Sequence, residues 1–444
     1  MRGSFFYLTL VLFTQFVFSQ NGFYIENNSG KTVIPFEIYN NLVVIPVQVN
    51  GVPLKFLLDT GVKESFIFSI DETNEINFAH VEKINIRGFG GVETFEAYKS
   101  SKNNIRIKDF VDTNHTLYLI LNQEINVSTQ VGIPINGILG YYFFKNKLIK
   151  INYENRKITI YNDNKKQVAK IKNSFSKINL DFFSGKPYLK VNVVTEENAT
   201  PITSNLLLDT GNSDAIWLFK ERINNYSLPK VTLQDYLGRG LSGDIYGDRA
   251  RIHEVKLDQF EFRKPLVAFP EIPVKKEIDS VTDRVGSIGS EIMKRFTTYY
   301  DYAENAMYIK KNSLFYEPFS YNMSGLEIQH QGVQWIKQTY QEGIQPTFNV
   351  FSDDGDKSIT NNLKYKFELK PVYIISSIRK DSPADVAGLQ KDDVIVKVNR
   401  RNGYSFKLQE LNELLKSQEG KLIEIEVERN GKPLKFKFQL QSIL

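Results

Sequence analysis

In two short segments of this sequence, a run of apolar residues is followed directly by an aspartate. Aspartate is a residue type that can act as an acid or a base. Residues 56–61 read FLLDTG, and residues 206–211, which lie 150 positions further on, read LLLDTG. A buried strand would deliver such a carboxylate into a protected place, where the threonine hydroxyl can brace the loop and glycine allows close backbone approach. Two carboxyls within about 3 Å cannot both ionise, so one keeps its proton. Such a pair can act as general base toward water and general acid toward a peptide carbonyl.

Other landmarks recur at matching distances from the two aspartates and indicate an internal repeat. Each aspartate is followed in turn by a glycine cluster, by a short element ending in glycine and by an aromatic-rich strand pair, at nearly the same spacing in both copies. The landmarks lie at 88–91, 138–140 and 149–161 in the first copy, and at 238–240, 287–289 and 299–309 in the second. The chain is therefore predicted to contain a duplicated module of roughly 130 to 150 residues.

The residue pattern of both copies predicts β-structure. Residues 42–49 form a strand-like run, and the Asn50-Gly51 pair that follows is a strong hairpin signal. Residues 187–194 open the second copy in the same way, and amphipathic helical patterns are few before residue 380. We therefore expect two mainly antiparallel β lobes.

This pattern resembles the aspartic proteases, in a single-chain, two-lobed version of the retropepsin-like family, over roughly residues 35 to 312. The resemblance implies two acid-protease-like β-barrel lobes with Asp59 and Asp209 as the catalytic pair. It also implies that the short elements at 138–140 and 287–289 pack beneath the catalytic loops, and that the glycine clusters form flap-like hairpins over the substrate. The loop-shaping residues are then Thr60, Gly61, Thr210 and Gly211, and the substrate-binding flap residues are Gly88, Phe89, Gly90, Gly238 and Gly240.

Two features depart from the family pattern. The residue after Asp-Thr-Gly is often Ser or Ala in the family, but here it is Val62 in the first copy and Asn212 in the second. Valine cannot donate a hydrogen bond to Asp59, whereas asparagine has the reach to bond to Asp209. The second short element is weakened to Ser-Ile-Gly at 287–289. We therefore expect the two aspartates to have unequal surroundings. We also expect the pair to work at less acidic pH than in stomach-type enzymes.

The activity that the resemblance implies is peptide-bond hydrolysis by an exported aspartic endopeptidase. The alternative is a catalytically inert protein that binds peptides in the cleft between its lobes and in the peptide groove of its C-terminal domain. Lobe packing alone would tolerate Asn or Ser in place of these aspartates, since an unpaired buried charge is costly. The retained pair of carboxyls favours catalysis.

A different pattern begins after Asn312. Residues 382–389 (SPADVAGL) and 392–399 (DDVIVKVN) resemble a PDZ domain of the kind attached to exported bacterial proteases. Residues 408–415 have helical spacing of apolar positions, and residues 423–432 alternate into an Asn-Gly hairpin turn. The resemblance implies an α+β PDZ domain after the two lobes.

A PDZ domain adds a peptide as a strand to an exposed sheet edge and holds its carboxylate with backbone N–H groups. By the resemblance, protein C-termini or substrate bind here, with Gly325, Leu326 and Ile328 as the peptide-binding residues. Residues 333–370 would then form a long insertion. The alternative is that the module only packs against the second lobe, and the sequence leaves both open.

Composition excludes several kinds of chemistry. The chain of 444 residues contains no cysteine and only four scattered histidines, so disulfides, thiol nucleophiles and thiolate zinc sites are absent from its repertoire. A net charge of +5 without a basic block gives no reason to expect nucleic acid. Residues 238–243 match G-x-G-x-x-G but are followed by strand-like sequence, which predicts a hairpin tip, and the acidic run at 353–356 predicts a solvated loop. We expect a monomer without metal or cofactor.

The segment 1–19 reads as a secretory signal peptide. A short positive start precedes an apolar run of about 14 residues, which is too short to cross a bilayer as a helix. We expect a protein without a stable membrane span, exported to the periplasm or secreted, and no large pro-segment. The expected domains are the first lobe at 31–165, the second lobe at 175–312 and the PDZ domain at 322–444.

Overall fold

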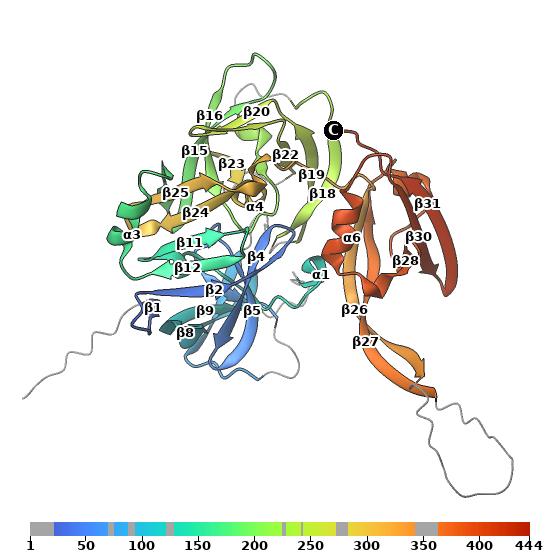
Figure 1. The fold of residues 1–444 in the computed structure, drawn as a ribbon, viewed down its shortest axis with the longest axis horizontal. Helices are drawn as coiled ribbons and strands as arrows, with labels where there is room; N and C mark the ends of the chain where they lie inside the picture. The colour runs from blue at the N-terminus through green and yellow to red at the C-terminus, as the bar shows by residue number, and fades with distance from the viewer. Residues whose placement is uncertain are drawn as a thin grey trace, which may run out of the picture.

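The computed structural model describes residues 22–69, 75–87, 94–120, 128–223, 228–240, 243–271, 283–341 and 363–444. Three predictions therefore lie outside the described residues, namely the signal peptide at 1–19, the glycine cluster at 88–91 and the acidic loop at 353–356. The described residues form a body of two β lobes with a smaller C-terminal module beside it (Figure 1). The predicted fold class, mainly β with duplicated lobes, is confirmed.

The first lobe is built around the strand that ends at Asp59. β5 (Val52–Leu58) pairs antiparallel with β4 (Leu42–Val49), and the Asn and Gly between them have positive φ, which confirms the predicted hairpin turn. β10 (Gly137–Leu139) lies parallel to β5. The other elements are β1 (Tyr24–Ile25), β3 (Glu37–Tyr39), β6 (Ser65–Ile67), β7 (Val81–Arg87), β8 (Thr94–Ile107), β9 (Phe110–Leu119), α1 (Ser128–Val131) and α2 (Tyr141–Phe144).

The second lobe repeats this arrangement around the strand that ends at Asp209. β16 (Ile202–Leu208) pairs antiparallel with β15 (Lys186–Val194) and parallel with β23 (Arg284–Ile288). β23 also pairs antiparallel with β17 (Ile216–Leu218), as β10 pairs with β6 in the first lobe. The other elements are β14 (Asp181–Phe183), η1 (Lys220–Arg222), β18 (Leu233–Gly240), β19 (Gly243–Arg251), β20 (Glu254–Leu257), β21 (Phe260–Arg263), β22 (Leu266–Pro270), α4 (Ser290–Met293), η3 (Tyr302–Glu304) and η4 (Ser313–Tyr316).

A shared sheet joins the two lobes. β11 (Leu148–Asn152) of the first lobe pairs antiparallel with β24 (Phe296–Asp301) of the second. The aromatic-rich strand pairs found in the two sequence copies therefore lie edge to edge in one sheet. Its remaining strands are β2 (Lys31–Pro35), β12 (Lys157–Tyr161), β13 (Ser176–Asn179) and β25 (Ala306–Lys311), and α3 (Asn164–Ile171) connects β12 to β13.

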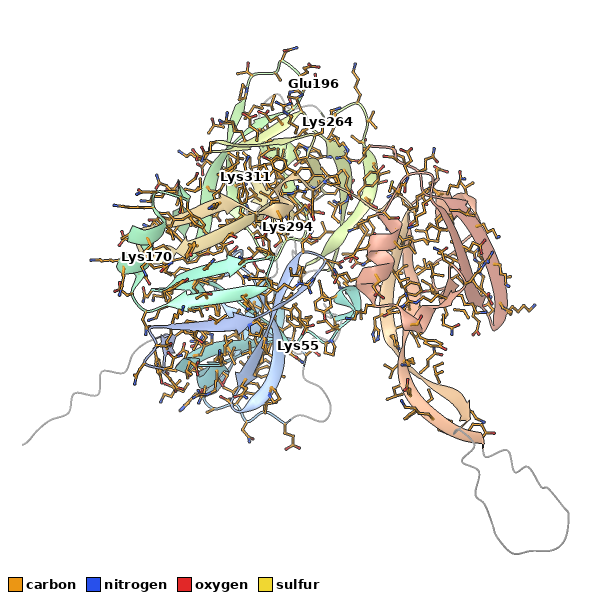
Figure 2. The ribbon with its side chains drawn as sticks, viewed as in Figure 1. Lys55, Lys170, Glu196, Lys264, Lys294 and Lys311 are labelled. Carbon is orange, nitrogen blue, oxygen red and sulfur yellow. The ribbon has the colours of Figure 1, made fainter. Side chains whose placement is uncertain are left out.

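Polar side chains join the lobes at a second place, near Lys294 (Figure 2). Asn41 of the first lobe accepts a hydrogen bond from Lys294 at 3.2 Å and donates one to Glu291 at 2.8 Å. Lys294 and Glu291 also form an ion pair at 2.9 Å. The lobes are thus held together by side chains as well as by the shared sheet.

The C-terminal module contains one sheet and the helix predicted from spacing. α6 (Leu408–Leu415) has the predicted limits and buries Leu408, Leu411 and Leu415. Residues 333–341 and 363–370 of the predicted insertion belong to a long antiparallel pair of β26 (Leu326–Gln341) and β27 (Leu363–Ile378), which projects beyond the module (Figure 1). The other elements are α5 (Pro383–Val386), β28 (Val394–Val398), β29 (Arg401–Asn402), η5 (Gly403–Ser405), β30 (Leu422–Arg429) and β31 (Lys432–Gln439).

Candidate active site

The two Asp-Thr-Gly loops hold each other through their threonines. The hydroxyl of Thr60 accepts the main-chain N–H of Thr210 at 3.0 Å and donates to the carbonyl of Leu208 at 2.7 Å. Thr210 makes the reciprocal pair, with the N–H of Thr60 and the carbonyl of Leu58, both at 3.0 Å. Both threonines are buried, and each hydroxyl is used as donor and acceptor. These four hydrogen bonds fix the loops against one another.

The glycines of the same loops leave room for the opposing carboxyls. A Cβ added to Gly61 would lie 2.6 Å from Oδ1 of Asp209, and a Cβ added to Gly211 would lie 2.2 Å from Oδ2 of Asp59. Such distances are well below van der Waals contact, so any side chain would push the opposite carboxyl away. The structure therefore brings the predicted catalytic pair together, with each carboxyl against the partner loop's glycine.

Each catalytic loop rests on the short element that comes later in its own lobe, as the resemblance implies. The main-chain N–H of the first aspartate donates to the carbonyl of Leu139 at 3.0 Å, and that of the second donates to Ile288 at 2.9 Å. A Cβ at Gly140 or Gly289 would meet a carbonyl of the loop at 2.5 or 2.2 Å. Close backbone packing is thus the reason that both elements end in glycine.

The two carboxyls have different hydrogen-bond partners. Oδ1 of Asp59 accepts the N–H of Gly61 at 2.7 Å, whereas Oδ1 of Asp209 accepts the N–H groups of Gly211 and Asn212, both at 3.1 Å. Asn212 thus reaches the aspartate through its main chain and not through its side chain. An extra N–H donor favours the charged form of Asp209.

Burial and mutual repulsion decide where the shared proton lies. Burial, followed by the charge of Asp209, raises the pKa of Asp59 to about 8. Burial also raises the pKa of Asp209, but the positive charges of Arg284 and Lys186 oppose this rise. These opposing influences favour Asp59 as the carrier of the shared proton and Asp209 as the charged partner.

The two cations near the pair were not identified from the sequence. Lys186 begins β15, and because β15 runs antiparallel to β16 its start lies beside the end of β16, next to Asp209. Arg284 begins β23 on the other side of β16, and its guanidinium lies over the ring of Phe219 at 5.2 Å. Lys186 could have been predicted from the sequence, because antiparallel pairing of residues 187–194 with the LLLDTG strand places it beside Asp209.

The predicted flap residues of the second lobe lie on a β-hairpin formed by β18 and β19. The register shifts between Tyr236 and Gly238, and Gly238 has a φ of 142° in open space, so its backbone conformation requires glycine. Gly240 ends β18. The G-x-G-x-x-G match is therefore part of a hairpin, as predicted. Contact of this hairpin with a substrate stays a prediction, and the counterpart residues 88–90 lie outside the described part of the chain.

A buried chain of charges links the second catalytic loop to the C-terminal module. Arg249 bonds to Asp214 at 2.8 Å and to Asp235 at 3.0 Å, and Arg379 of the module bonds to Asp235 at 3.3 Å. The N–H of Asp214 donates to the side chain of Asn212 at 2.9 Å, which connects this chain to the loop. We call Asp214, Asp235, Arg249 and Arg379 the bridging network. Removing one member would leave a neighbouring buried charge with one partner fewer.

The predicted PDZ residues Gly325, Leu326 and Ile328 lie at the start of β26, on the side of the module that faces the lobes. The N–H groups of Ser324 and Gly325 donate to the side chain of Asn322, at 3.0 and 3.3 Å, and the N–H of Leu326 donates to Ser324 at 3.0 Å. The backbone donors expected to hold a carboxylate are therefore already used within the loop. Their contact with a peptide stays a prediction.

A cavity of about 590 Å³ separates the module from the lobes. It is lined by Glu327, Ile328 and Gln329 of β26, by polar residues of α6 such as Asn412, and by members of the bridging network. Burial, followed by the charge of Asp235, raises the pKa of Glu327 to about 7. β26 is an edge strand among the described residues, and its residues line this cavity together with Ser213 and Asp214, which follow the second Asp-Thr-Gly loop.

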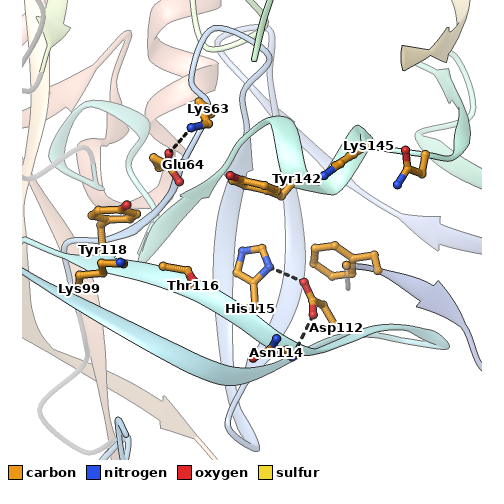
Figure 3. Close-up of a pocket in the computed structure, with 13 residues that line it drawn as sticks. Lys63, Glu64, Lys99, Asp112, Asn114, His115, Thr116, Tyr118, Tyr142 and Lys145 are labelled. Atoms are coloured by element: carbon orange, nitrogen blue, oxygen red, sulfur yellow. Dashed lines mark hydrogen bonds and ion pairs between the residues drawn. The ribbon is translucent and has the colours of Figure 1, made fainter. Parts of the chain in front are cut away.

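A Ser-His-Asp arrangement lies in the first lobe beside a cavity of about 480 Å³, and Figure 3 shows its histidine and aspartate, His115 and Asp112. Nδ1 of His115 is 2.8 Å from Asp112, and its Nε2 is 2.8 Å from the hydroxyl of Ser65. The scattered positions of the histidines in the sequence gave no sign of this convergence. All three side chains are buried and Ser65 is 0% exposed, so its hydroxyl cannot reach a substrate carbonyl. The trio instead ties β6, which follows the first catalytic loop, to β9.

Among the described residues, no group of three or more His, Cys, Asp or Glu side chains is placed to hold a metal ion. Across those same residues, no helix combines the length and the apolar character that a membrane crossing needs.

Comparison with known proteins matches two parts of the chain. Residues 45–143 match the aspartyl protease family, and residues 374–429 match the PDZ domain. The first range contains Asp59 with its loop and the supporting element of the first lobe. The second contains the core of the C-terminal module.

Two individual proteins are similar to parts of the chain. The probable 26S proteasome non-ATPase regulatory subunit 9 of Caenorhabditis elegans is 36% identical over 67 residues, which are 15% of this chain and 34% of that protein. The chain thus spans about a third of the length of this relative. The crystal structure of an aspartic proteinase from Irpex lacteus gives a TM-score of 0.41 at 10% identity, over 65% of this chain and 99% of that chain. The family matches show a retropepsin-like aspartyl protease domain over residues 45–143 and, C-terminal to it, a PDZ domain over residues 374–429.

Proposed function

We propose that this chain is an exported aspartic endopeptidase that hydrolyses peptide bonds with a water molecule activated by Asp59 and Asp209. The observation that carries the proposal is the pair itself, in which the buried carboxyl of Asp59 and the half-buried carboxyl of Asp209 face each other across mutually bonded loops. One holds a proton and the other a charge, which is the state that combined acid and base catalysis needs.

The protonation of the pair assigns a role to each carboxyl. The charged Asp209 accepts a proton from water as the water oxygen attacks the carbonyl carbon of the substrate. Asp59 donates its proton to the carbonyl oxygen, and a tetrahedral diol forms. The diol then collapses. Asp209 gives its new proton to the leaving nitrogen, the C–N bond breaks, and one hydroxyl of the diol returns a proton to Asp59.

Cleavage of a mixed peptide library by the mature protein between about pH 3 and pH 9 tests this function. Asp59→Asn and Asp209→Asn variants and a pepstatin-type inhibitor serve as controls. We expect cleavage by the parent and its loss in both variants and with the inhibitor. If the folded parent cleaves nothing at any pH but retains peptides as well as both variants do, the inert peptide-binding alternative replaces the proposal.

We further propose that the PDZ domain binds a peptide segment of the substrate in the cavity between the module and the lobes. Asn412 on α6 and Glu327 on β26 both line this cavity, and bridging-network residues beside the catalytic loop complete it. An Asn412→Trp variant should raise KM for long substrates and leave short peptides unaffected. Glu419→Trp, at an exposed position outside the cavity, is the matched control. Equal KM values for long peptides in both variants would contradict this part.

Export is part of the proposal and is tested separately. The motivating observation is the charged start and short apolar run of segment 1–19. Mass spectrometry of the protein recovered outside the cytoplasm should give a mature N-terminus close to residue 20. A protein that stays in the cytoplasm with segment 1–19 still attached would contradict export but not proteolysis.

A further inference from the structure

The long hairpin of the C-terminal module has an outer part without a core of its own. Residues 333–341 of β26 pair with residues 363–371 of β27 in continuous antiparallel register, and we call this segment the ribbon. It projects away from the body and from the rest of the module (Figure 1). Two-stranded ribbons are at best marginally stable in water unless a face is covered.

One face of the ribbon is apolar and aromatic. Residues directly opposite each other share a face, and the register pairs Trp335 with Leu369 and places Val333, Phe367 and Tyr365 on that same face. These five side chains are all more than half exposed, from 51% for Tyr365 to 68% for Trp335. Contiguous apolar surface of this kind marks an interaction site in a protein that is otherwise well packed.

The opposite face is mainly charged. Glu368 lies between Lys366 and Lys370 and forms ion pairs with them at 2.5 and 2.6 Å, and Gln334 and Ile336 lie across the ribbon. The ribbon is therefore amphipathic by strand periodicity, with one face suited to water and the other not. We therefore expect another surface to cover the apolar face.

One cation on the apolar face decides which occupant fits. Lys337 lies opposite Phe367, and its ammonium is 3.6 Å from the ring centroid of Tyr365. A second copy stacked on this face would bury Lys337 beside its own symmetry mate, which is costly for like charges. At a lipid surface the lysine stem follows the apolar face while its ammonium meets an anionic headgroup.

The other side chains agree with the lipid surface. Trp and Tyr have apolar rings with a polar end, which suits the boundary between acyl chains and headgroups. Among the described side chains of the ribbon, Lys337 is the one charge on the apolar face, and Lys366 and Lys370 on the opposite face outnumber their partner Glu368, so the segment has a net positive charge that attracts an anionic surface. We propose that the apolar face of the ribbon docks on an anionic lipid surface and holds the C-terminal module there.

Sedimentation of the full chain with vesicles tests this docking. We compare vesicles of phosphatidylglycerol and phosphatidylcholine with vesicles of phosphatidylcholine alone. The parent should bind the anionic vesicles, and a Trp335→Ser/Phe367→Ser variant should bind them roughly a hundredfold more weakly, because two large apolar side chains no longer enter the lipid. Ile336→Ser on the opposite face is the matched control and should bind within about twofold of the parent.

Two single substitutions separate the apolar and the charged contributions. Lys337→Glu keeps the apolar face and should weaken binding to the anionic vesicles roughly tenfold. Trp335→Phe should still sediment but should lose the blue shift of tryptophan emission that the parent shows with vesicles. The readout is clear because the chain has only two tryptophans, and the other, Trp217, is hydrogen-bonded to Asp214 inside the second lobe.

The proposal is overturned if the folded parent does not sediment with anionic vesicles, or if the Trp335→Ser/Phe367→Ser variant sediments as well as the parent. It is also overturned if the parent doubles its mass in solution and this variant stays single, because the occupant is then a second copy. Because the ribbon lies outside the module's core, circular dichroism of each variant should match the parent. Peptide cleavage plays no part in these readouts.

Discussion

The two lobes share one topology but support their aspartates with different chemistry. At matching positions the first lobe has Val62 and Ile138, and the second has Asn212 and Ser287. Val62 packs against the buried apolar cluster that contains Ile138, whereas the side chain of Asn212 donates to the hydroxyl of Ser287 at 3.2 Å. The two departures from the family pattern are thus a single exchange of an apolar pair for a polar one.

Two lobes of the same topology can therefore give their aspartates unequal tendencies to be charged. The second lobe adds a main-chain donor and the cations Lys186 and Arg284 to the surroundings of Asp209, and these favour its charged form. The first lobe offers Asp59 one main-chain donor and an apolar neighbour, so the proton stays there. The roles of base and acid that we propose therefore follow from the surroundings in each lobe and not from the repeated motif.

The lobes also differ in what secures the segment after each catalytic loop. In the first lobe the Ser65, His115 and Asp112 trio secures it from within the lobe. In the second lobe Asp214 is secured through Arg249, and the bridging network continues into the C-terminal module. The module is therefore connected to the lobe that holds the charge.

The largest expected effect comes from removing either carboxyl. Asp59→Asn and Asp209→Asn should each reduce kcat by a factor on the order of 10³ or more, because the acid or the base is lost. Cleavage of one peptide by both variants, with circular dichroism to confirm folding, measures this. Substantial activity in one variant would show that the two carboxyls do not act as a unit.

The next effect comes from the glycines between the carboxyls. Gly61→Ala would place a Cβ at 2.6 Å from Asp209, so we expect that carboxyl to shift and kcat to fall roughly a hundredfold. Gly51→Ala, in the β4–β5 turn, has open space around it but a φ of 90°, so it costs stability through backbone strain far from the pair and is a control for the effect of lost stability on kcat. Equal kcat values in the two variants would contradict the geometry of the pair.

A smaller effect tests the link between the second lobe and the module. Arg379→Met leaves Asp235 with one partner in a buried place, so the free energy of unfolding should fall by about 3 kcal/mol. We expect kcat for a short peptide to fall roughly tenfold with little change in KM, because Asn212 and the loop lose support. Cleavage kinetics and thermal unfolding measure these effects.

Arg429→Met is the matched control for this prediction. Arg429 pairs with Asp393 at 2.6 Å inside the module, so its loss destabilises the module without touching the second lobe. It should lower stability and leave kcat for the short peptide near that of the parent. If both substitutions lower kcat equally, the module affects catalysis through its stability and not through the bridging network.

The repeat made the fold and the catalytic pair predictable from the sequence. The spacing of Asp59 and Asp209 and of the glycine-ended elements encodes strand pairings that the structure contains, and α6 could be read from apolar periodicity. The bridging network could not be predicted, because Asp214, Asp235 and Arg379 meet only through the packing of three separate segments. Such charges look like ordinary surface residues in a sequence.

The smallest effect concerns pH and the cation next to Asp209. Activity needs Asp59 protonated and Asp209 charged, so it should fall as pH rises through about 8, where Asp59 loses its proton. Lys186 lowers the pKa of both carboxyls, so Lys186→Met should raise both values and move the whole pH profile to higher pH. Lys190→Met, an exposed change on the same strand, should leave the profile in place. A profile of kcat/KM that moves to lower pH, or that moves equally in both variants, would mean that Lys186 does not set the charge of the pair.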